Sequence, residues 1–224
     1  TDLLFPRLCP VCGKALNVGE KHVCALCLAQ LPLTHYDTIQ FNPMEQLFAG
    51  KVPVERATGY FFYERGSRHA AILHSIKYHN QPLMGQWLAR RFAAALKRNG
   101  WLDGIDAIVP VPLHKSKMAL RGYNQSEYIA RGIAAECGCA VEQLVVAVKR
   151  HETQTHKGLH ERLLNTMGIY KASSKANRYA DKHILLVDDV VTTGATLLSC
   201  ATALLQAVPD MRISIATLAV ARLQ

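Results

Sequence analysis

Short runs of apolar residues recur along the chain and predict the strands of a buried sheet. The run 184–187 is continuously apolar and branched, and the runs 105–109 and 213–220 are largely apolar. A strand that is apolar without alternation is typical of a parallel sheet covered on both faces. An aromatic-rich run at 57–63 and a short apolar run at 141–148 predict two further strands.

Stretches with apolar residues at helical spacing separate these strands. We expect helices over 68–78, 84–98 and 195–206, and another that continues to about residue 136. Strands that alternate with helices indicate an α/β fold with an open, mostly parallel sheet flanked by helices.

Composition limits the class of protein. Half of the 224 residues are apolar, which is enough for a sizeable core, and no apolar run approaches the roughly 20 residues of a membrane span. We therefore expect a soluble, cytoplasmic protein without a membrane span. Lys and Arg exceed Asp and Glu by 26 − 17 = 9. This positive net charge favours phosphates, nucleotides or nucleic acid as partners. The alternative is that the charge only keeps the protein soluble.

Four cysteines near the N-terminus form two Cys-x-x-Cys pairs, Cys9 with Cys12 and Cys24 with Cys27. Four thiolates at this spacing can close a tetrahedral zinc site without an open position, which predicts a structural Zn²⁺. Disulfides or free thiols are the alternatives, and His22 could replace one cysteine as a ligand.

The segment 28–54 contains three prolines and little periodicity, so we interpret it as a linker with at most a short helix near 44–50. This predicts an N-terminal zinc-knuckle module and linker over 1–53, and an α/β domain over 54–224.

The most informative stretch follows the strand at 184–187. The turn Thr192-Thr193-Gly194 leads directly into the helix that begins at Ala195, and Thr196 adds a further hydroxyl. Free backbone N–H groups at such a junction bind anions, and glycine lets a ligand approach the main chain. We expect a phosphate here.

Asp188 and Asp189 precede this turn and need another part of the same ligand. Neighbouring carboxylates repel an anion, whereas ribose hydroxyls or Mg²⁺ would satisfy them. The alternative is an ordinary strand, turn and helix with Asp near a cap.

A basic segment with Lys115, Lys117 and Arg121, which we expect to be a loop, follows the strand at 105–109, where an open α/β sheet places ligand-binding groups. These cations suit a pyrophosphate, or they are simply solvated. The polar stretch 151–159, followed by Arg162 and Asn165, is either a flap over a reacting site or a surface loop.

These motifs occur together and in order, and their combination resembles the ComF family. Its members are type I phosphoribosyltransferase-like proteins associated with competence for DNA uptake and transformation. The resemblance rests on the cysteine pairs, Ile76-Lys77-Tyr78, the segments 109–113 and 121–126, Gln154-Thr155 with the segment 161–165, and the loop after 187.

The resemblance implies a type I phosphoribosyltransferase-like fold with a small N-terminal zinc module of four cysteines, and phosphoribosyl pyrophosphate (PRPP), or a related ribose phosphate, as ligand with Mg²⁺. Asp188 and Asp189 would hold the ribose diol, and the basic segment would contact the pyrophosphate. The residues implied in PRPP binding within the loop are Asp188, Asp189, Val190, Val191, Thr192, Thr193, Gly194, Ala195 and Thr196.

Two functions remain open at this point. One is a PRPP-dependent transferase with an unknown acceptor, in which Asp188 and Asp189 are catalytic. The other is a non-catalytic, PRPP-sensing accessory protein that binds single-stranded DNA and acts with DNA-uptake proteins.

Overall fold

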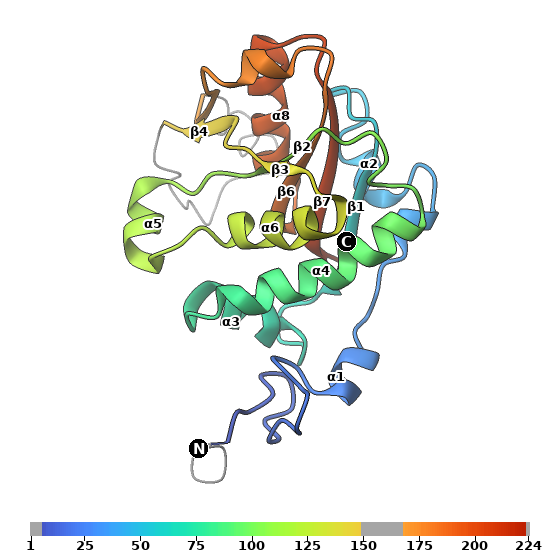
Figure 1. The fold of residues 1–224 in the computed structure, drawn as a ribbon, viewed down its shortest axis with the longest axis vertical. Coiled ribbons are helices and arrows are strands. Elements are labelled where there is room, and N and C mark those ends of the chain that lie inside the picture. Colours follow the sequence, from blue (N-terminus) through green and yellow to red (C-terminus); the bar gives the residue numbers. More distant parts are fainter. Residues whose placement is uncertain (1–5, 149–167, 223–224) are drawn as a thin grey trace.

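A computed structural model describes residues 6–148 and 168–222. Its centre is a five-stranded, fully parallel sheet with the strand order β1-β7-β6-β2-β3 (Figure 1). The strands are β1 (Ala57–Tyr63), β2 (Ala107–Pro110), β3 (Ala140–Val141), β6 (His183–Val191) and β7 (Arg212–Ala221). A separate antiparallel pair joins β4 (Val145–Ala147) to β5 (Tyr170–Ala172).

Helices cover both faces of the large sheet. The helices α4 (Pro82–Arg98) and α6 (Gln125–Cys137) lie on one face, and α8 (Ala195–Ala207) lies on the other (Figure 1). Alternate residues of β6 divide accordingly: Leu185 and Val187 join the core under α4 and α6, and Leu186 joins the core under α8. The strand is therefore apolar on both sides, and the predicted α/β fold is confirmed.

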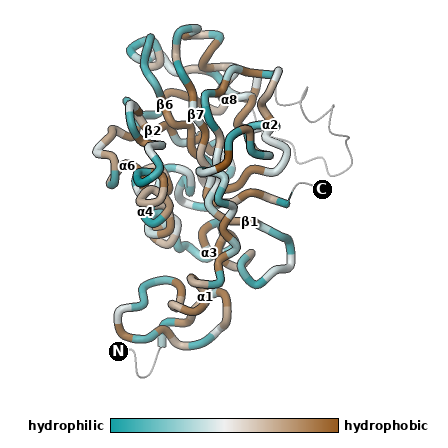
Figure 2. The backbone as a smooth tube through the Cα atoms, turned by 90° about the vertical axis from the view of Figure 1, so that its right-hand side faces the viewer, coloured by the Kyte–Doolittle hydropathy of each residue, from teal (hydrophilic) through white to brown (hydrophobic). Residues whose placement is uncertain are grey.

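The remaining helices are short and lie around the sheet. They are α1 (Ala25–Ala29), α2 (Pro43–Gln46), α3 (Ala70–Tyr78) and α5 (Lys115–Arg121), with 3-10 turns η1 (Tyr36–Thr38) and η2 (Ala176–Tyr179). The hydropathy of the chain follows this arrangement, because the central strands are largely brown and many outer loops are teal in Figure 2. None of the helices within these described ranges is long and apolar enough to cross a membrane.

Two local predictions were wrong. The run 141–148 is not one strand, because the polar residues Glu142 and Gln143 interrupt it. Its first part, β3, belongs to the large parallel sheet, whereas its second part, β4, pairs with β5 in the separate antiparallel pair. The basic segment predicted as a loop forms the helix α5 instead. His114 caps its start by accepting a hydrogen bond from the Ser116 N–H at 3.2 Å, and Gly122 ends it in the left-handed conformation.

The segment 28–54 packs closely against the sheet, although its prolines suggested a linker. Thr34 N–H donates to the Tyr60 carbonyl at 3.1 Å, and Phe62 N–H donates to the Pro32 carbonyl at 2.8 Å, so backbone groups of the edge strand β1 are paired. Phe48 is 1% exposed and belongs to the core beneath α8. A boundary at residues 53/54 stays a prediction.

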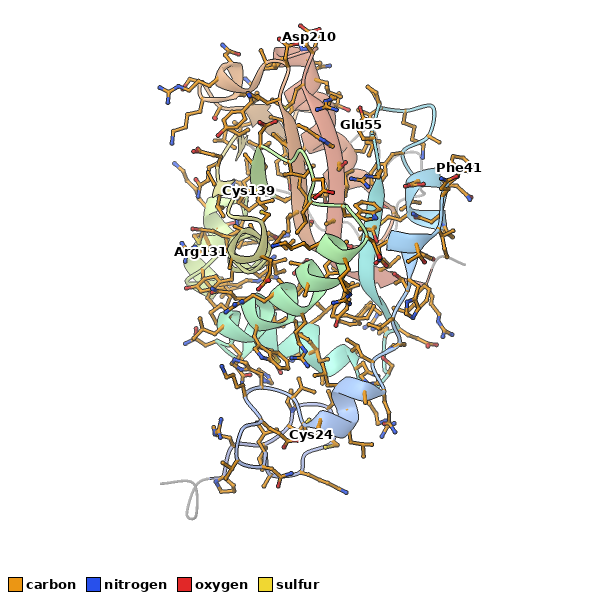
Figure 3. All side chains as sticks on the ribbon, turned by 45° about the vertical axis from the view of Figure 1, so that its right-hand side comes forward. Cys24, Phe41, Glu55, Arg131, Cys139 and Asp210 are labelled. Carbon is orange, nitrogen blue, oxygen red and sulfur yellow. The ribbon has the colours of Figure 1, made fainter. Side chains whose placement is uncertain are left out.

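The cysteine module lies at one end of the molecule, where Figure 3 labels Cys24, and Asp210 marks the opposite end. Cys27 is buried in the same apolar cluster as Leu73 of α3. The module also contacts α4, because the rings of His22 and Trp87 lie 5.7 Å apart. Helices α3 and α4 therefore connect the module to the sheet.

Candidate functional site

The predicted site lies where the strand order of the sheet reverses. From β2 the chain passes through α6 to β3 on one side, and later returns to β6 on the other side of β2. The strands β2 and β6 stay paired to the end of β2, since Val111 N–H donates to the Val187 carbonyl at 2.8 Å. The carboxyl ends of strands at such a reversal form the usual binding crevice of open α/β sheets. Here they carry residues 188–196 and the segment that leads into α5.

Asp188 is a buried carboxyl group held by two donors. Its Oδ1 accepts hydrogen bonds from the Ser126 hydroxyl at 2.8 Å and from the Asp189 N–H at 2.9 Å. Burial and the neighbouring charge of Asp189 raise the pKa of Asp188 to about 7, against the opposing effect of Ser126. This carboxyl group therefore changes its charge near neutral pH.

Asp189 is 4% exposed and takes its partner from α3. The Lys77 ammonium lies 3.0 Å from its Oδ2, and the Lys77 side chain is 19% exposed. The two carboxylates therefore take their partners from different helices, Asp188 from the start of α6 and Asp189 from α3. Helix periodicity alone does not reveal this ion pair, because Asp189 lies 112 positions after Lys77 in the chain.

Ser126 reaches Asp188 because hydrogen bonds hold the segment 121–126 in place. Asn124 caps α6 by accepting from the Ser126 N–H at 3.1 Å, and its side-chain amide donates to the Val111 carbonyl at 3.0 Å. The Tyr123 hydroxyl donates to the Ile76 carbonyl of α3. These bonds join the end of β2, the start of α6 and the end of α3 around the two carboxylates.

The turn after β6 encloses a hollow of about 40 Å³ at the first turn of α8, lined by Asp188 and residues 190–197. Gly194 caps the helix with a φ of 76°, a conformation that strongly favours glycine. Phe48 packs behind it, 3.4 Å from where a Cβ would stand. The free N–H groups at the start of α8 make this hollow suitable for a phosphate.

Tyr170 supports the same helix from β5. Its hydroxyl interacts with the Thr196 side chain, and burial, with smaller effects of Cys200 and Asp188, raises the Tyr170 pKa. Ser126, Tyr170 and Phe48 were not predicted as part of the site. Only the tertiary fold brings them there, and an Asn-Gln-Ser sequence at a helix start was the one signal that could have indicated Ser126.

The predicted pyrophosphate contacts are only partly assembled. Arg121 donates to the Gln125 side chain at 2.9 Å, and its guanidinium lies 5.2 Å from the centre of the Tyr78 ring, beside the end of α3. Lys115 and Lys117 are exposed on α5, and within the described residues no hydrogen bond or ion pair joins either of them to 188–196. Their role stays a prediction. The stretch 151–159, Arg162 and Asn165 lie outside the described residues.

The four N-terminal cysteines come together as predicted. Their Sγ atoms lie within 4.8 Å of one another, and those of Cys12 and Cys24 are 3.8 Å apart. A tetrahedron with Zn–S bonds of about 2.3 Å has edges of about 3.8 Å. Burial raises the pKa of the Cys9 thiol. Hydrogen bonds from backbone N–H groups, mainly that of Cys24, have a larger opposite effect and lower the Cys9 pKa to about 7. This cluster could hold a metal ion such as zinc, whereas His22 packs against Trp87.

Comparisons with known proteins agree with this geometry. The family described as "Phosphoribosyl transferase domain" matches residues 124–223, which include Ser126 and the loop after β6. Competence protein F of Haemophilus influenzae is 27% identical over 197 residues, 86% of this chain and 76% of that protein. The DNA utilization protein YhgH of Salmonella typhimurium is 26% identical over 220 residues, 91% of this chain and 93% of that protein.

A shorter match covers competence protein ComFC of Bacillus subtilis, which is 35% identical over 99 residues, 44% of this chain and 38% of that protein. Among solved structures, the adenine phosphoribosyltransferase of Leishmania tarentolae aligns with a TM-score of 0.39 and 11% identity, over 80% of this chain and 88% of that one. The fold is that of the type I phosphoribosyltransferases. The chain is similar to proteins named competence protein F, ComFC and DNA utilization protein YhgH, which supports the resemblance to the ComF family that its motifs indicate.

Proposed function

We propose that the protein binds PRPP with Mg²⁺ and transfers the phosphoribosyl group to an acceptor. The observation that carries this proposal is the phosphate-sized hollow under α8 directly beside the buried carboxylates Asp188 and Asp189. The 5′-phosphate would accept hydrogen bonds from N–H groups of residues 192–196, and the ribose hydroxyls would donate to the carboxylates.

In the proposed reaction, the acceptor forms a bond to C1 of the ribose while the bond from C1 to pyrophosphate breaks. Positive charge that develops on the ribose ring in the transition state lies near Asp188 and Asp189, which stabilise it. Mg²⁺, when bound with PRPP, would neutralise the leaving pyrophosphate. Arg121, with Lys115 and Lys117 of α5, would contact the pyrophosphate from the end of β2.

The binding step is tested by calorimetry with PRPP in the presence and absence of Mg²⁺, with ribose 5-phosphate as the comparison ligand. We expect both to bind, and PRPP to bind more tightly only with Mg²⁺. Turnover is tested by pyrophosphate release with candidate bases and amines. A protein that binds neither ribose phosphate at millimolar concentration would refute the proposal.

A second function is favoured by the net charge of +9 and by the names of the relatives, which refer to competence and DNA utilization. In this proposal the protein is a cytoplasmic accessory factor of DNA uptake that senses PRPP, binds single-stranded DNA without chemistry, and acts with DNA-uptake proteins. Its affinity for a short oligodeoxythymidylate should fall steeply as salt is raised, because each phosphate contact releases counterions. Absence of binding at low salt would exclude it.

We further propose that the ion in the cysteine cluster is a structural Zn²⁺ held by Cys9, Cys12, Cys24 and Cys27. Cys24→Ser should remove bound zinc and lower the free energy of unfolding together, because metal binding contributes to folding. Cys137→Ser, outside the cluster, is the matched control and should retain zinc. Metal analysis and urea unfolding of both variants give the result. A Cys24→Ser protein with full zinc content and stability would contradict a structural site.

A further inference from the structure

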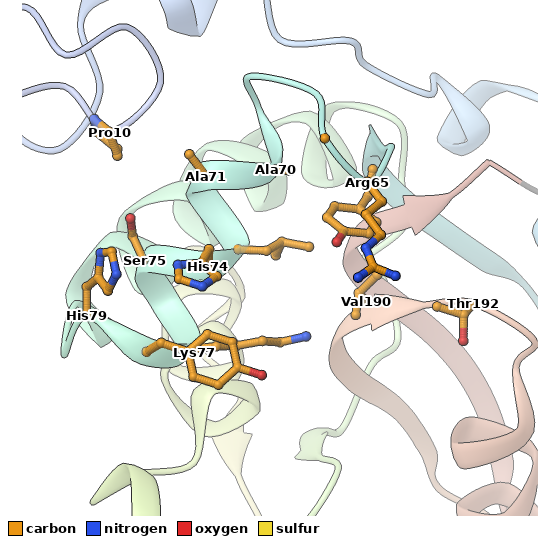
Figure 4. A pocket seen from close by; sticks show the side chains of 14 residues that line it. Pro10, Arg65, Ala70, Ala71, His74, Ser75, Lys77, His79, Val190 and Thr192 are labelled. Carbon is orange, nitrogen blue, oxygen red and sulfur yellow. The ribbon is translucent and has the colours of Figure 1, made fainter. Parts of the chain in front are cut away.

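A pocket of about 690 Å³ adjoins the hollow under α8. It lies between the end of β1, the helix α3 and the loop after β6, and Figure 4 shows its lining side chains. Val190 and Thr192 line both spaces, so a ligand in the pocket would meet a ribose held by the loop. Pro10, which directly follows Cys9 of the cysteine module, completes the rim. The volume is that of a small-molecule site.

Aromatic rings form one side of this pocket. On α3 and just after it, the His74 ring lies 4.9 Å from the rings of both Tyr78 and His79. Tyr63, at the end of β1, adds a fourth ring to the lining. Faces and edges of such rings favour a flat aromatic ligand by offset or edge-to-face contact.

The charges of the pocket are positive. Arg65 and Lys77 both line it, and in Figure 4 their side chains extend toward the space beside Val190. None of the described residues that line it is an Asp or a Glu. The exposed Arg65 guanidinium can donate paired hydrogen bonds in a planar geometry to a carboxylate or phosphate group, a contact that a neutral base does not offer.

We propose that this pocket binds the acceptor, and that the acceptor is a flat aromatic molecule carrying an anionic group. This inference rests on the proposed transfer reaction. The aromatic ring lies against His74, Tyr78 and His79, and the anionic group contacts Arg65. The ring edge then faces Val190 and Thr192, at the border with the ribose.

Lys77 lies between the proposed PRPP site and the acceptor pocket. Its ammonium is engaged by Asp189 at 3.0 Å, in the place where the proposed ribose diol and Mg²⁺ would bind. When the ribose and Mg²⁺ bind Asp189, the ion pair between Lys77 and Asp189 is broken. The Lys77 ammonium is then free to contact an anionic group in the pocket. PRPP and the anionic acceptor therefore bind with positive coupling, and the affinity of each rises by the same factor when the other is present.

The test uses nicotinate and nicotinamide, which share a ring and differ in charge, with the full chain and in the presence or absence of PRPP and Mg²⁺. Calorimetry should show that nicotinate binds about tenfold more tightly than nicotinamide, as expected for one charge-assisted contact. Cyclohexanecarboxylate should bind more weakly than nicotinate because it cannot stack. Thymidine 5′-phosphate, the other source of an anionic aromatic group, distinguishes a nucleotide from a free aromatic acid.

Two variants locate the effect. Arg65→Gln should reduce the preference for nicotinate to about threefold or less, whereas Arg68→Gln, an exposed neighbour that does not line the pocket, should leave it unchanged. Thermal unfolding of each variant checks that it is folded. Equal affinities for nicotinate and nicotinamide, or an Arg65→Gln protein with the full preference, overturn the inference.

The binding of PRPP, measured in the same samples, separates the two proposals. If PRPP binds and no aromatic acid does, the acceptor inference fails and the PRPP site stands. If nicotinate binds with the expected preference but PRPP does not bind, the proposed transfer reaction fails.

Discussion

Two segments of the molecule follow neighbouring strands and were predicted to bind parts of one ligand, yet they differ in construction. The segment 188–196, which is the end of β6 and the turn after it, contains two carboxylates less than a tenth exposed, held by Ser126 and Lys77, and a glycine backed by Phe48. The helix α5 after β2 has no buried residue, and Leu120 is 83% exposed. One segment is anchored before a ligand arrives, and the other is held mainly through its ends.

This difference indicates a division of roles. Groups that must face a ligand in a fixed geometry benefit from being held by their surroundings, because ordering them later costs binding energy. Long cationic side chains on an exposed helix contribute attraction over a distance but little geometry. We therefore expect changes in the loop to affect binding strongly, and changes in α5 to affect it weakly and in a salt-dependent way.

The largest effect should come from the carboxylates. The double change Asp188→Asn with Asp189→Asn removes the proposed ribose and Mg²⁺ ligands and leaves Lys77 without its partner. PRPP affinity should fall roughly a hundredfold, measured by calorimetry. Affinity for single-stranded DNA should be unchanged or slightly higher. Asp210→Asn, exposed at the far end of the molecule, is the control for loss of charge. Unaltered PRPP binding in the double variant would exclude this loop as the site.

Two glycines compare the anchoring of the segments directly. Gly194 and Gly122 have nearly the same φ, 76° and 78°, so alanine costs each about 1 kcal/mol in backbone strain. At Gly194 the new Cβ would stand 3.4 Å from Phe48, which is ordinary van der Waals contact, and at Gly122 nothing lies within 4 Å. Urea unfolding should therefore show a similar loss of about 1 kcal/mol for Gly194→Ala and for Gly122→Ala. A much larger loss for Gly194→Ala would contradict this expectation and would mean that Phe48 cannot accommodate the added Cβ.

The buried position of Asp188 predicts a pH dependence. Its pKa is about 7 in the folded chain and ordinarily 3.8, so between these values the folded state holds a proton that the unfolded state has lost. The free energy of unfolding should therefore decrease as pH rises from about 4 to 7. Asp188→Asn removes this contribution, and urea unfolding at pH 5 and pH 7.5 should show a smaller decrease than in the unchanged protein. The same decrease in both proteins would show that Asp188 does not titrate in this range.

The comparison also explains what the sequence could and could not predict. The strand, acidic pair and Thr-Thr-Gly turn are contiguous, so local pattern was enough to locate the loop and the α/β fold around it. Lys77 and Ser126 reach Asp189 and Asp188 from distant parts of the chain, and only the packing of α3 and α6 against β6 reveals them. Phe48 lies in a proline-rich segment whose burial depends on the edge strand β1. No local periodicity indicates such contacts.

The smallest effect is expected in α5. Lys115 and Lys117 are exposed, and their charges are screened by water and salt, so replacing both by alanine should weaken PRPP binding only about three- to tenfold. The loss should diminish as salt is raised from 50 to 300 mM, because attraction over a distance is screened within about 10 Å at moderate ionic strength. Ribose 5-phosphate, which lacks the pyrophosphate, is the control ligand and should bind the double variant as well as it binds the unchanged protein. A hundredfold loss of PRPP affinity that persists at high salt would instead mean that α5 contacts the ligand directly. The two segments would then contribute equally to binding.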